Sequence, residues 1–221
     1  MKNSFKIVFF IMFILVVFAI GILGLSKLKV DDFHKAAVIF IVDSSASNLK
    51  KLPEQTKIVR QLCSMLDPED HVKILRVSQD AYLIYEGSPQ SGAEIRKSMD
   101  KFTKFDSKEY GTAYGLSLEK AFRHSITMNK NGYIPAVVVV GDLENEGDAS
   151  KQINWKTLPN DVKKVLDETE NFSMMFLYAA PHKLDMVKEK LTPVLGEDKL
   201  IIGTETTAGK SLRKFLYAIG R

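Results

Sequence analysis

Short apolar runs and helical stripes of apolar residues alternate along most of the chain. Residues 36–42 form an unbroken apolar run rich in Val, Ile and Phe. The run is too short for a helix and ends abruptly at Asp43, which predicts a strand buried on both faces. A second run of this kind, residues 134–140, ends at Gly141-Asp142. Apolar residues at spacings of three and four predict helices in the ranges 53–66, 91–105, 112–126, 161–169, 184–195 and 211–219.

The remaining apolar segments predict the other strands of one sheet. Residues 71–78 and 81–87 are rich in β-forming side chains and are separated by only two residues, which predicts an antiparallel hairpin. Further strands are expected at 172–179 and 199–202. Strands that alternate with helices are typical of a parallel sheet. The predicted class is α/β, a doubly wound, mostly parallel sheet with one antiparallel edge hairpin strand and helices on both faces.

The amino terminus has a different pattern. Residues 7–25 contain only apolar side chains and Gly, and Lys2 and Lys6 precede them. This length matches the roughly 20 residues that cross a bilayer, whereas the apolar region of a cleaved signal peptide has about 7–15. We therefore expect a transmembrane anchor, with a cleaved signal as the alternative, and the domain on the non-cytoplasmic side. The predicted organisation is a tail (1–6), the anchor (7–25), a linker (26–35) and one domain (36–221).

Composition narrows the classes of partner. The chain has 221 residues, of which 45% are hydrophobic and 26% charged, and its net charge is +4. This charge is spread along the chain without a dense basic run, so no nucleic-acid partner is expected. The one cysteine, Cys63, falls on the apolar stripe of a predicted helix. We interpret it as a small buried hydrophobic residue.

Oxygen-bearing side chains follow the two most apolar strands. Asp43, Ser45 and Ser47 come at the end of the first, and Asp142 directly follows the second. Thr112 opens a predicted helix. Ligands of open α/β sheets gather at the carboxyl ends of the strands. Two carboxylates and three hydroxyls without Cys or His suit Mg²⁺ or Mn²⁺ rather than zinc.

These residues also fit a known family pattern. The Asp-x-Ser-x-Ser sequence of residues 43–47, the Thr segment 111–121, and the strand and Asp of 137–142 resemble the von Willebrand factor A (vWA) domains. The resemblance extends from about Ala36 to the carboxyl terminus. Two positions differ from the usual family pattern. Asn48 stands where Met usually follows the first motif, and Leu143 stands where Gly usually follows the last Asp, so Leu143 bears on the shape of that loop.

The resemblance implies a metal-ion-dependent adhesion site. Ser45, Ser47 and Thr112 would contact the cation directly, and Asp43 and Asp142 would often hold it through water. A Glu or Asp from a protein partner would fill the open coordination position. The resemblance therefore implies metal-dependent protein binding without catalysis. Together with the predicted anchor, this gives a membrane-anchored binding domain, and no small-molecule substrate is expected.

Two other interpretations remain. Asp43 and Ser47 can simply cap turns, and Thr112 can cap its helix, which would leave a scaffold with an unused metal site. A phosphohydrolase or nucleotide-binding enzyme could use the same acidic site or the segment Gly209-Lys210-Ser211. That segment resembles a phosphate-binding loop, but its first glycine comes one position too early.

The histidines give little support to a hydrolytic enzyme. The prediction places them on connections and at helix ends, with no Ser or Cys nucleophile motif nearby. The four are His34, His71, His124 and His182.

Overall fold

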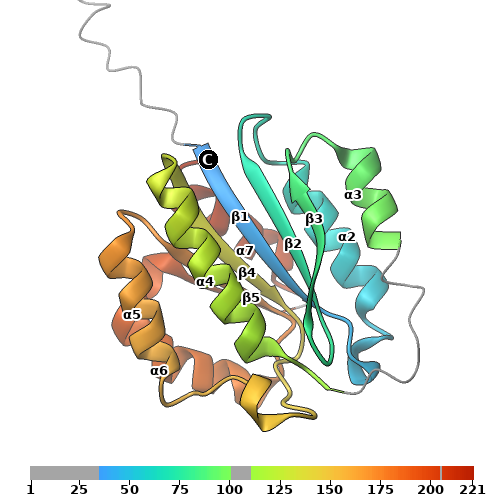
Figure 1. Cartoon of the computed structure of the whole chain (residues 1–221), viewed down its shortest axis with the longest axis vertical. Helices are drawn as coiled ribbons and strands as arrows, with labels where there is room; N and C mark the ends of the chain where they lie inside the picture. Colours follow the sequence, from blue (N-terminus) through green and yellow to red (C-terminus); the bar gives the residue numbers. More distant parts are fainter. Residues whose placement is uncertain (1–34, 101–110, 205) are drawn as a thin grey trace, which may run out of the picture. The chain divides into compact units, whose positions relative to one another are not determined.

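The structure is a computed structural model, and it describes residues 35–100, 111–204 and 206–221. Strands and helices alternate along most of this part of the chain (Figure 1). The strands are β1 (Lys35–Asp43), β2 (His71–Val77), β3 (Ala81–Gly87), β4 (Tyr133–Val140), β5 (Ser173–Leu177) and β6 (Leu200–Gly203). The α-helices are α2 (Leu52–Cys63), α3 (Gly92–Met99), α4 (Tyr114–Lys130), α5 (Leu158–Glu168), α6 (Pro181–Lys199) and α7 (Ala208–Ala218), with 3-10 turns η1 (Ala46–Asn48) and η3 (Ala149–Lys151).

The six strands form one sheet in the order β3-β2-β1-β4-β5-β6. β1 lies at its centre and pairs in parallel with both β2 and β4, while β5 and β6 continue the parallel arrangement. β2 and β3 pair antiparallel and place β3 at one edge. The structure confirms the predicted mixed sheet and its hairpin.

Helices cover the sheet on both faces because successive strand residues point to opposite sides. In β1, Val38, Phe40 and Val42 pack into one apolar cluster together with residues of α2, α3 and α7. Ile39 and Ile41 pack into a second cluster together with residues of α4, α5 and α6. This double burial explains the continuous apolar run of the central strand.

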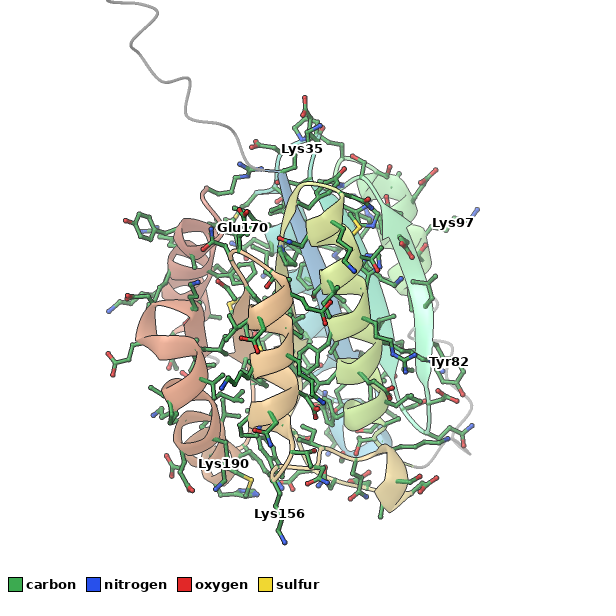
Figure 2. The ribbon with its side chains drawn as sticks, turned by 60° about the vertical axis from the view of Figure 1, so that its left-hand side comes forward. Lys35, Tyr82, Lys97, Lys156, Glu170 and Lys190 are labelled. Atoms are coloured by element: carbon green, nitrogen blue, oxygen red, sulfur yellow. The ribbon has the colours of Figure 1, made fainter. Side chains whose placement is uncertain are left out.

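The parallel strands give the sheet two chemically different ends. Figure 2 shows Lys35, the first residue of β1, at one end, and Lys156, in the connection after β4, at the other. Asp43 ends β1 and Asp142 follows β4, so both lie at the carboxyl end of the sheet. His71 begins β2 and lies level with Ala37 near the amino end.

The end of the described chain is fastened to the amino end of the sheet. The carboxylate of Asp70 is buried and accepts hydrogen bonds from the backbone N–H of Ala36 (2.7 Å) and of Asp67 (2.8 Å). The guanidinium of Arg221 donates to both carboxylate oxygens of Asp70 and pairs with Asp67 at 3.1 Å. One buried acid therefore joins β1, the turn before β2 and the end of α7.

Some helix boundaries differ from the prediction. α6 runs from Pro181 to Lys199, beyond the predicted 184–195, and it contains a non-helical Gly196 with φ of 75°. α3 ends at Met99, and the rest of the predicted helix 91–105 extends into residues 101–110, which lie outside the described residues. The interpretation of Cys63 as a buried residue is confirmed, and burial raises the pKa of its thiol to about 12.

The predicted anchor, residues 7–25, lies outside the described residues, as does the predicted linker up to residue 34. Among the helices from residue 35 onward that the structure describes, none combines the length and the apolar character needed to cross a membrane.

Candidate metal centre

Asp43 is the centre of a buried polar network at the carboxyl end of β1. Its side chain has no solvent exposure, and one carboxylate oxygen accepts a hydrogen bond from the backbone N–H of Ser45 at 2.8 Å. The other oxygen accepts a hydrogen bond from the hydroxyl of Tyr114, at the start of α4, at 2.9 Å. Both carboxylate oxygens are therefore held in place from two different elements.

The turn after β1 brings two hydroxyls beside this carboxylate. The hydroxyl oxygens of Ser45 and Ser47 lie 3.1 Å apart, with Ser45 buried and Ser47 exposed. The side-chain amide of Asn48 donates to the carbonyl of Asp43 at 3.0 Å and forms a reciprocal amide pair with Gln55 on α2. Asn48, which departs from the family pattern, thus holds the turn against the strand.

Thr112 precedes α4 and is bound to the loop that follows β4. Its hydroxyl donates to the carbonyl of Glu144 at 2.6 Å and accepts from the backbone N–H of Glu146 at 2.9 Å. A hydroxyl has one proton and two lone pairs, so one lone pair of Thr112 is left for another ligand. The backbone N–H of Thr112 also donates to the carbonyl of Glu146.

Asp142 begins that loop and shapes it. One carboxylate oxygen of Asp142 accepts from the backbone N–H of Glu144 at 2.9 Å. The next residue, Leu143, has a φ of 62°, a left-handed conformation that glycine adopts without strain. Its side chain is fully buried in the apolar cluster of α4. Leu143, at the usual glycine position, therefore takes a glycine-like backbone conformation. The burial of its side chain offsets the energetic cost of this conformation.

The electrostatics of Asp43 show that a carboxylate is held there at a cost. Burial raises the pKa of Asp43 to about 6; the hydrogen bond from Ser45 opposes this rise, and the nearby charge of Asp142 adds to it. Among the described basic side chains, none forms an ion pair with either acid. Two neighbouring carboxylates that lack a cationic partner favour the binding of a cation between them.

Tyr114 is a site residue that the sequence pattern did not identify. Its hydroxyl donates to Asp43 and accepts from the backbone N–H of Leu143 at 3.3 Å. Burial, followed by the charge of Asp43, raises the pKa of this phenol well above its usual range. A Cβ at Gly141 would lie 2.1 Å from the tyrosine hydroxyl oxygen, so only glycine allows this approach. The sequence contains both Tyr114 and Gly141, but the apolar periodicity indicates only a core position for Tyr114 and does not reveal that its hydroxyl binds Asp43.

The structure brings the five predicted residues to one end of the sheet in two groups. Direct hydrogen bonds connect Asp43, Ser45 and Ser47, whereas Thr112 is joined to the loop of Asp142. The two groups are linked by the electrostatic interaction between Asp43 and Asp142 and by the hydroxyl of Tyr114, which bonds to Asp43 and to Leu143. That these five residues bind a cation stays a prediction. A hollow of about 200 Å³ adjoins Thr112, and its lining includes Glu146, Asp148 and Lys151.

Residues in and before the segment that resembles a phosphate-binding loop form hydrogen bonds in α7 and in the turn that precedes it. Ser211 is buried in this helix, and its hydroxyl donates to the carbonyl of Ile202 at 3.1 Å. The hydroxyl of Thr207 accepts from the backbone N–H of Thr204 at 2.8 Å, which closes the turn before the helix. Gly203 packs against Leu177 and Ser211 with no room for a Cβ.

Comparisons with known proteins identify the fold of the chain. Neither a protein-family profile nor a curated protein matches the sequence. Among solved structures, von Willebrand factor type A from Catenulispora acidiphila matches with a TM-score of 0.59 and 16% identity over 84% of this chain and 43% of that one. The chain has a vWA-like fold.

Two further vWA-like neighbours carry metals according to their descriptions. Manganese-loaded TRAP protein of Plasmodium vivax matches with a TM-score of 0.59 and 12% identity, covering 83% of this chain and 74% of that one. Proximal thread matrix protein 1 from the mussel byssus, described with a zinc-occupied MIDAS motif, matches with a TM-score of 0.56 and 16% identity over 83% and 46%. The chain thus spans less than half the length of two of these three proteins.

Proposed function

We propose that this vWA-like domain binds a protein partner through a divalent cation, Mg²⁺ or Mn²⁺, and acts by binding rather than by catalysis. Two predicted ligand groups would hold the cation, the one formed by Asp43, Ser45 and Ser47 and the one formed by Thr112 and Asp142. The observation that carries the proposal is the pair of acids Asp43 and Asp142, the first fully buried, with which no basic side chain in the described part of the chain forms an ion pair.

The chemistry of these side chains fits the proposed cation. All five offer oxygen atoms, which Mg²⁺ and Mn²⁺ prefer. A bound cation would supply an electrophilic centre for a carboxylate ligand. The protein would contribute fixed oxygens, because Tyr114 and the N–H of Ser45 orient the Asp43 carboxylate. The manganese-loaded and zinc-occupied neighbours support a divalent ion in this fold.

We further propose that residues 7–25 anchor the domain in a membrane, with the domain on the non-cytoplasmic side. The uninterrupted apolar run and the two preceding lysines support this. The partner would then be a protein that reaches the membrane-held domain from that side.

Metal binding is tested by titrating the purified full-length protein with Mn²⁺ in a calorimeter. The wild type should bind, and Asp142→Ala should weaken binding at least tenfold because one of two carboxylates is removed. Asp185→Ala is the matched control, since Asp185 is an exposed acid on α6. Equal affinities in wild type and Asp142→Ala would overturn the proposed site.

Carboxylate recognition is tested by selecting displayed peptides in Mn²⁺ and eluting them with a chelator. We expect every selected peptide to contain an Asp or Glu whose amide substitution abolishes binding. Peptides that bind equally well in chelator, or that lack an acid, would contradict the proposed mode of recognition.

A further inference from the structure

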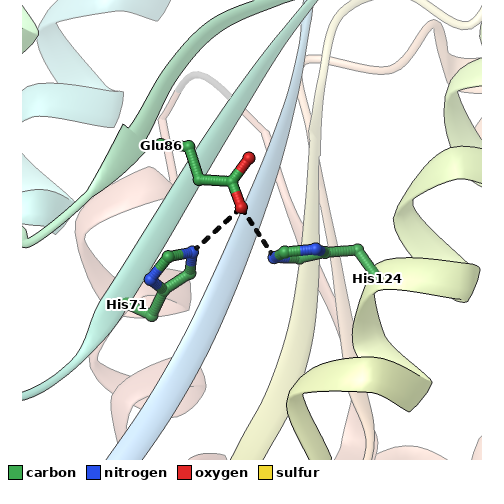
Figure 3. Close-up of side chains that lie close together, drawn as sticks. All are labelled: His71, Glu86 and His124. Atoms are coloured by element: carbon green, nitrogen blue, oxygen red, sulfur yellow. Dashed lines mark ion pairs between the residues drawn. The ribbon is translucent and has the colours of Figure 1, made fainter.

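Three side chains that could hold a metal converge near the opposite end of the sheet (Figure 3). His71 begins β2, Glu86 lies near the end of β3, and His124 lies on α4. The Nε2 atoms of the two histidines lie 3.6 Å and 3.8 Å from the same oxygen, Oε1 of Glu86. All three atoms fall within 4.8 Å of one another.

Strand register and helix packing explain why these residues meet. His71 and Lys73 point to the same face of β2 as Leu75, which packs in the α4 cluster. Glu86 pairs directly with Lys73 across the antiparallel hairpin and so shares that face. α4 covers this face and adds His124. The sequence analysis placed the histidines on connections and at helix ends, and this is wrong for His71, which begins β2, and for His124, which lies within α4.

The two histidines aim buried nitrogen atoms at this position. Their Nε2 atoms are shielded from solvent and have no hydrogen-bond partner in the part of the chain that the structure describes. The separations from Glu86 are too long for hydrogen bonds. A tetrahedral ion with bonds of 2.0–2.2 Å keeps its ligand atoms about 3.4 Å apart. The observed 3.6 Å and 3.8 Å separations are close to that value.

The local charges prepare both kinds of ligand. Burial, and then the charge of Lys73, lowers the pKa of His124 to about 4, so its imidazole is neutral at pH 7. Burial pushes the pKa of Glu86 upward, but the hydrogen bond and the charge of Lys73 lead the opposing contributions, so this pKa is lowered and the carboxylate is ionised at pH 7. Neutral imidazole and ionised carboxylate are the forms that bind metals.

Lys73 now occupies the cation's role in this cluster. Its ammonium nitrogen lies 2.8 Å from the second oxygen of Glu86 and 3.4 Å from Nδ1 of His124. Lysine is a compact charge on a flexible stem, so it can turn away when another cation enters. A donor beside Nδ1 opposes the tautomer that a metal on Nε2 requires, which makes Lys73 a competitor of the metal.

We propose that His71, Glu86 and His124 form a second metal site, which takes Zn²⁺ with water as the fourth ligand. Two imidazoles and one carboxylate suit zinc, in contrast to the all-oxygen donors predicted at the other end of the sheet. The bound ion would tie the edge hairpin of β2 and β3 to α4 and thereby stabilise the fold. The proposal does not depend on the proposed adhesion function.

The test uses Co²⁺ as a spectroscopic substitute for Zn²⁺ in the chelator-treated, full-length protein. We expect a strong visible absorption band from tetrahedral Co²⁺, displaced by Zn²⁺, and a higher Tm with either metal. His71→Ala and His124→Ala should abolish the band. Glu86→Gln, which preserves size, should weaken Co²⁺ binding at least tenfold. Lys73→Met should strengthen it about tenfold or more, because the variant lacks the competing charge.

Two controls separate this site from other metal binding. His182→Ala removes an exposed histidine that pairs with Glu144 at 3.0 Å, and it should leave the band unchanged. Asp142→Ala should also leave the band unchanged, even if it abolishes Mn²⁺ binding. The absence of a band in the wild type at millimolar Co²⁺ would overturn the proposal, leaving an internal ion-pair network around Lys73. A band that persists in His124→Ala would also overturn it.

Discussion

At the scale of single residues, the buried hydroxyl of Tyr114 is the clearest case of one atom serving two elements. It donates to Asp43 at the end of β1 and accepts from Leu143 after β4. Each bond satisfies a group that has no access to solvent. The tyrosine therefore both packs in the core and fixes the geometry of the proposed cation site.

Tyr114→Phe should destabilise the metal-free protein by about 1–3 kcal/mol, since a buried carboxylate oxygen loses its donor. Urea unfolding at pH 7 measures the change. Tyr217→Phe is the matched control because the Tyr217 side chain is 84% exposed, and we expect it to leave the midpoint unchanged. Coincident unfolding curves for wild type and Tyr114→Phe would show that this hydroxyl contributes nothing.

The raised pKa of Asp43 predicts a pH dependence with a definite sign. The folded-state pKa of about 6 lies above the ordinary 3.8. Between these values the folded protein keeps a proton that the unfolded chain releases, so this group's stabilising contribution falls as pH rises. The loss from pH 4 to pH 7 is about 2.4 kcal/mol.

Asp43→Asn should remove that loss. We expect the unfolding free energy of the variant minus that of the wild type to rise by about 2.4 kcal/mol between pH 4 and pH 7 in chelator. His124, whose pKa is lowered, contributes the opposite slope, but it is present in both proteins and cancels in the difference. A pH-independent difference between the two proteins would refute the raised pKa.

At the scale of elements, α4 carries residues of both proposed metal sites. Tyr114 begins the helix and His124 lies ten positions later, a rise of about 15 Å along the axis. Tyr114 contacts the hydrogen-bonded network of the proposed cation site, and His124 faces the edge hairpin. The position of α4 therefore affects the geometry of both proposed metal sites.

Arg221 joins the chain after α7 to the start of the sheet, so its loss should lower the stability of the protein substantially. Arg221→Ala should lower the unfolding free energy by about 3–5 kcal/mol, since it leaves the Asp70 carboxylate buried without its cation. Thermal and urea unfolding measure the loss. Arg123→Ala breaks an exposed pair with Glu119 on α4 and should cost less than about 0.5 kcal/mol. Equal costs for the two variants would contradict the role of burial.

At the scale of the whole molecule, the sequence predicted the architecture because burial on two faces leaves a distinctive apolar run. Residues 36–42 and 134–140 are such runs, and they became the adjacent central strands β1 and β4. The same logic placed Asp43 and Asp142 at one end of the sheet. Helix ends were less well predicted: α6 begins three residues before the predicted start and continues past the non-helical Gly196 to Lys199.

The histidine cluster and Tyr114 could not be predicted from periodicity. His71, Glu86 and His124 come from three elements, and their meeting depends on strand register and on the position of α4. Tyr114 lies on the apolar stripe of its helix. Its ring fits the helical pattern, but the pattern gives no information about the hydrogen bonds of its hydroxyl. Long-range pairing, which local spacing does not encode, decided both cases.

The nine-residue length of β1 also fixes the distance between the start of the domain and the proposed cation site. A parallel strand rises about 3.3 Å per residue, so Asp43 lies about 26 Å from Lys35, where the preceding chain joins the domain. The central strand would thus act as a rigid spacer between the proposed membrane attachment and the proposed adhesion site. A load applied through a bound partner would pass along the hydrogen-bonded ladders on both sides of β1, the best-supported strand in the sheet.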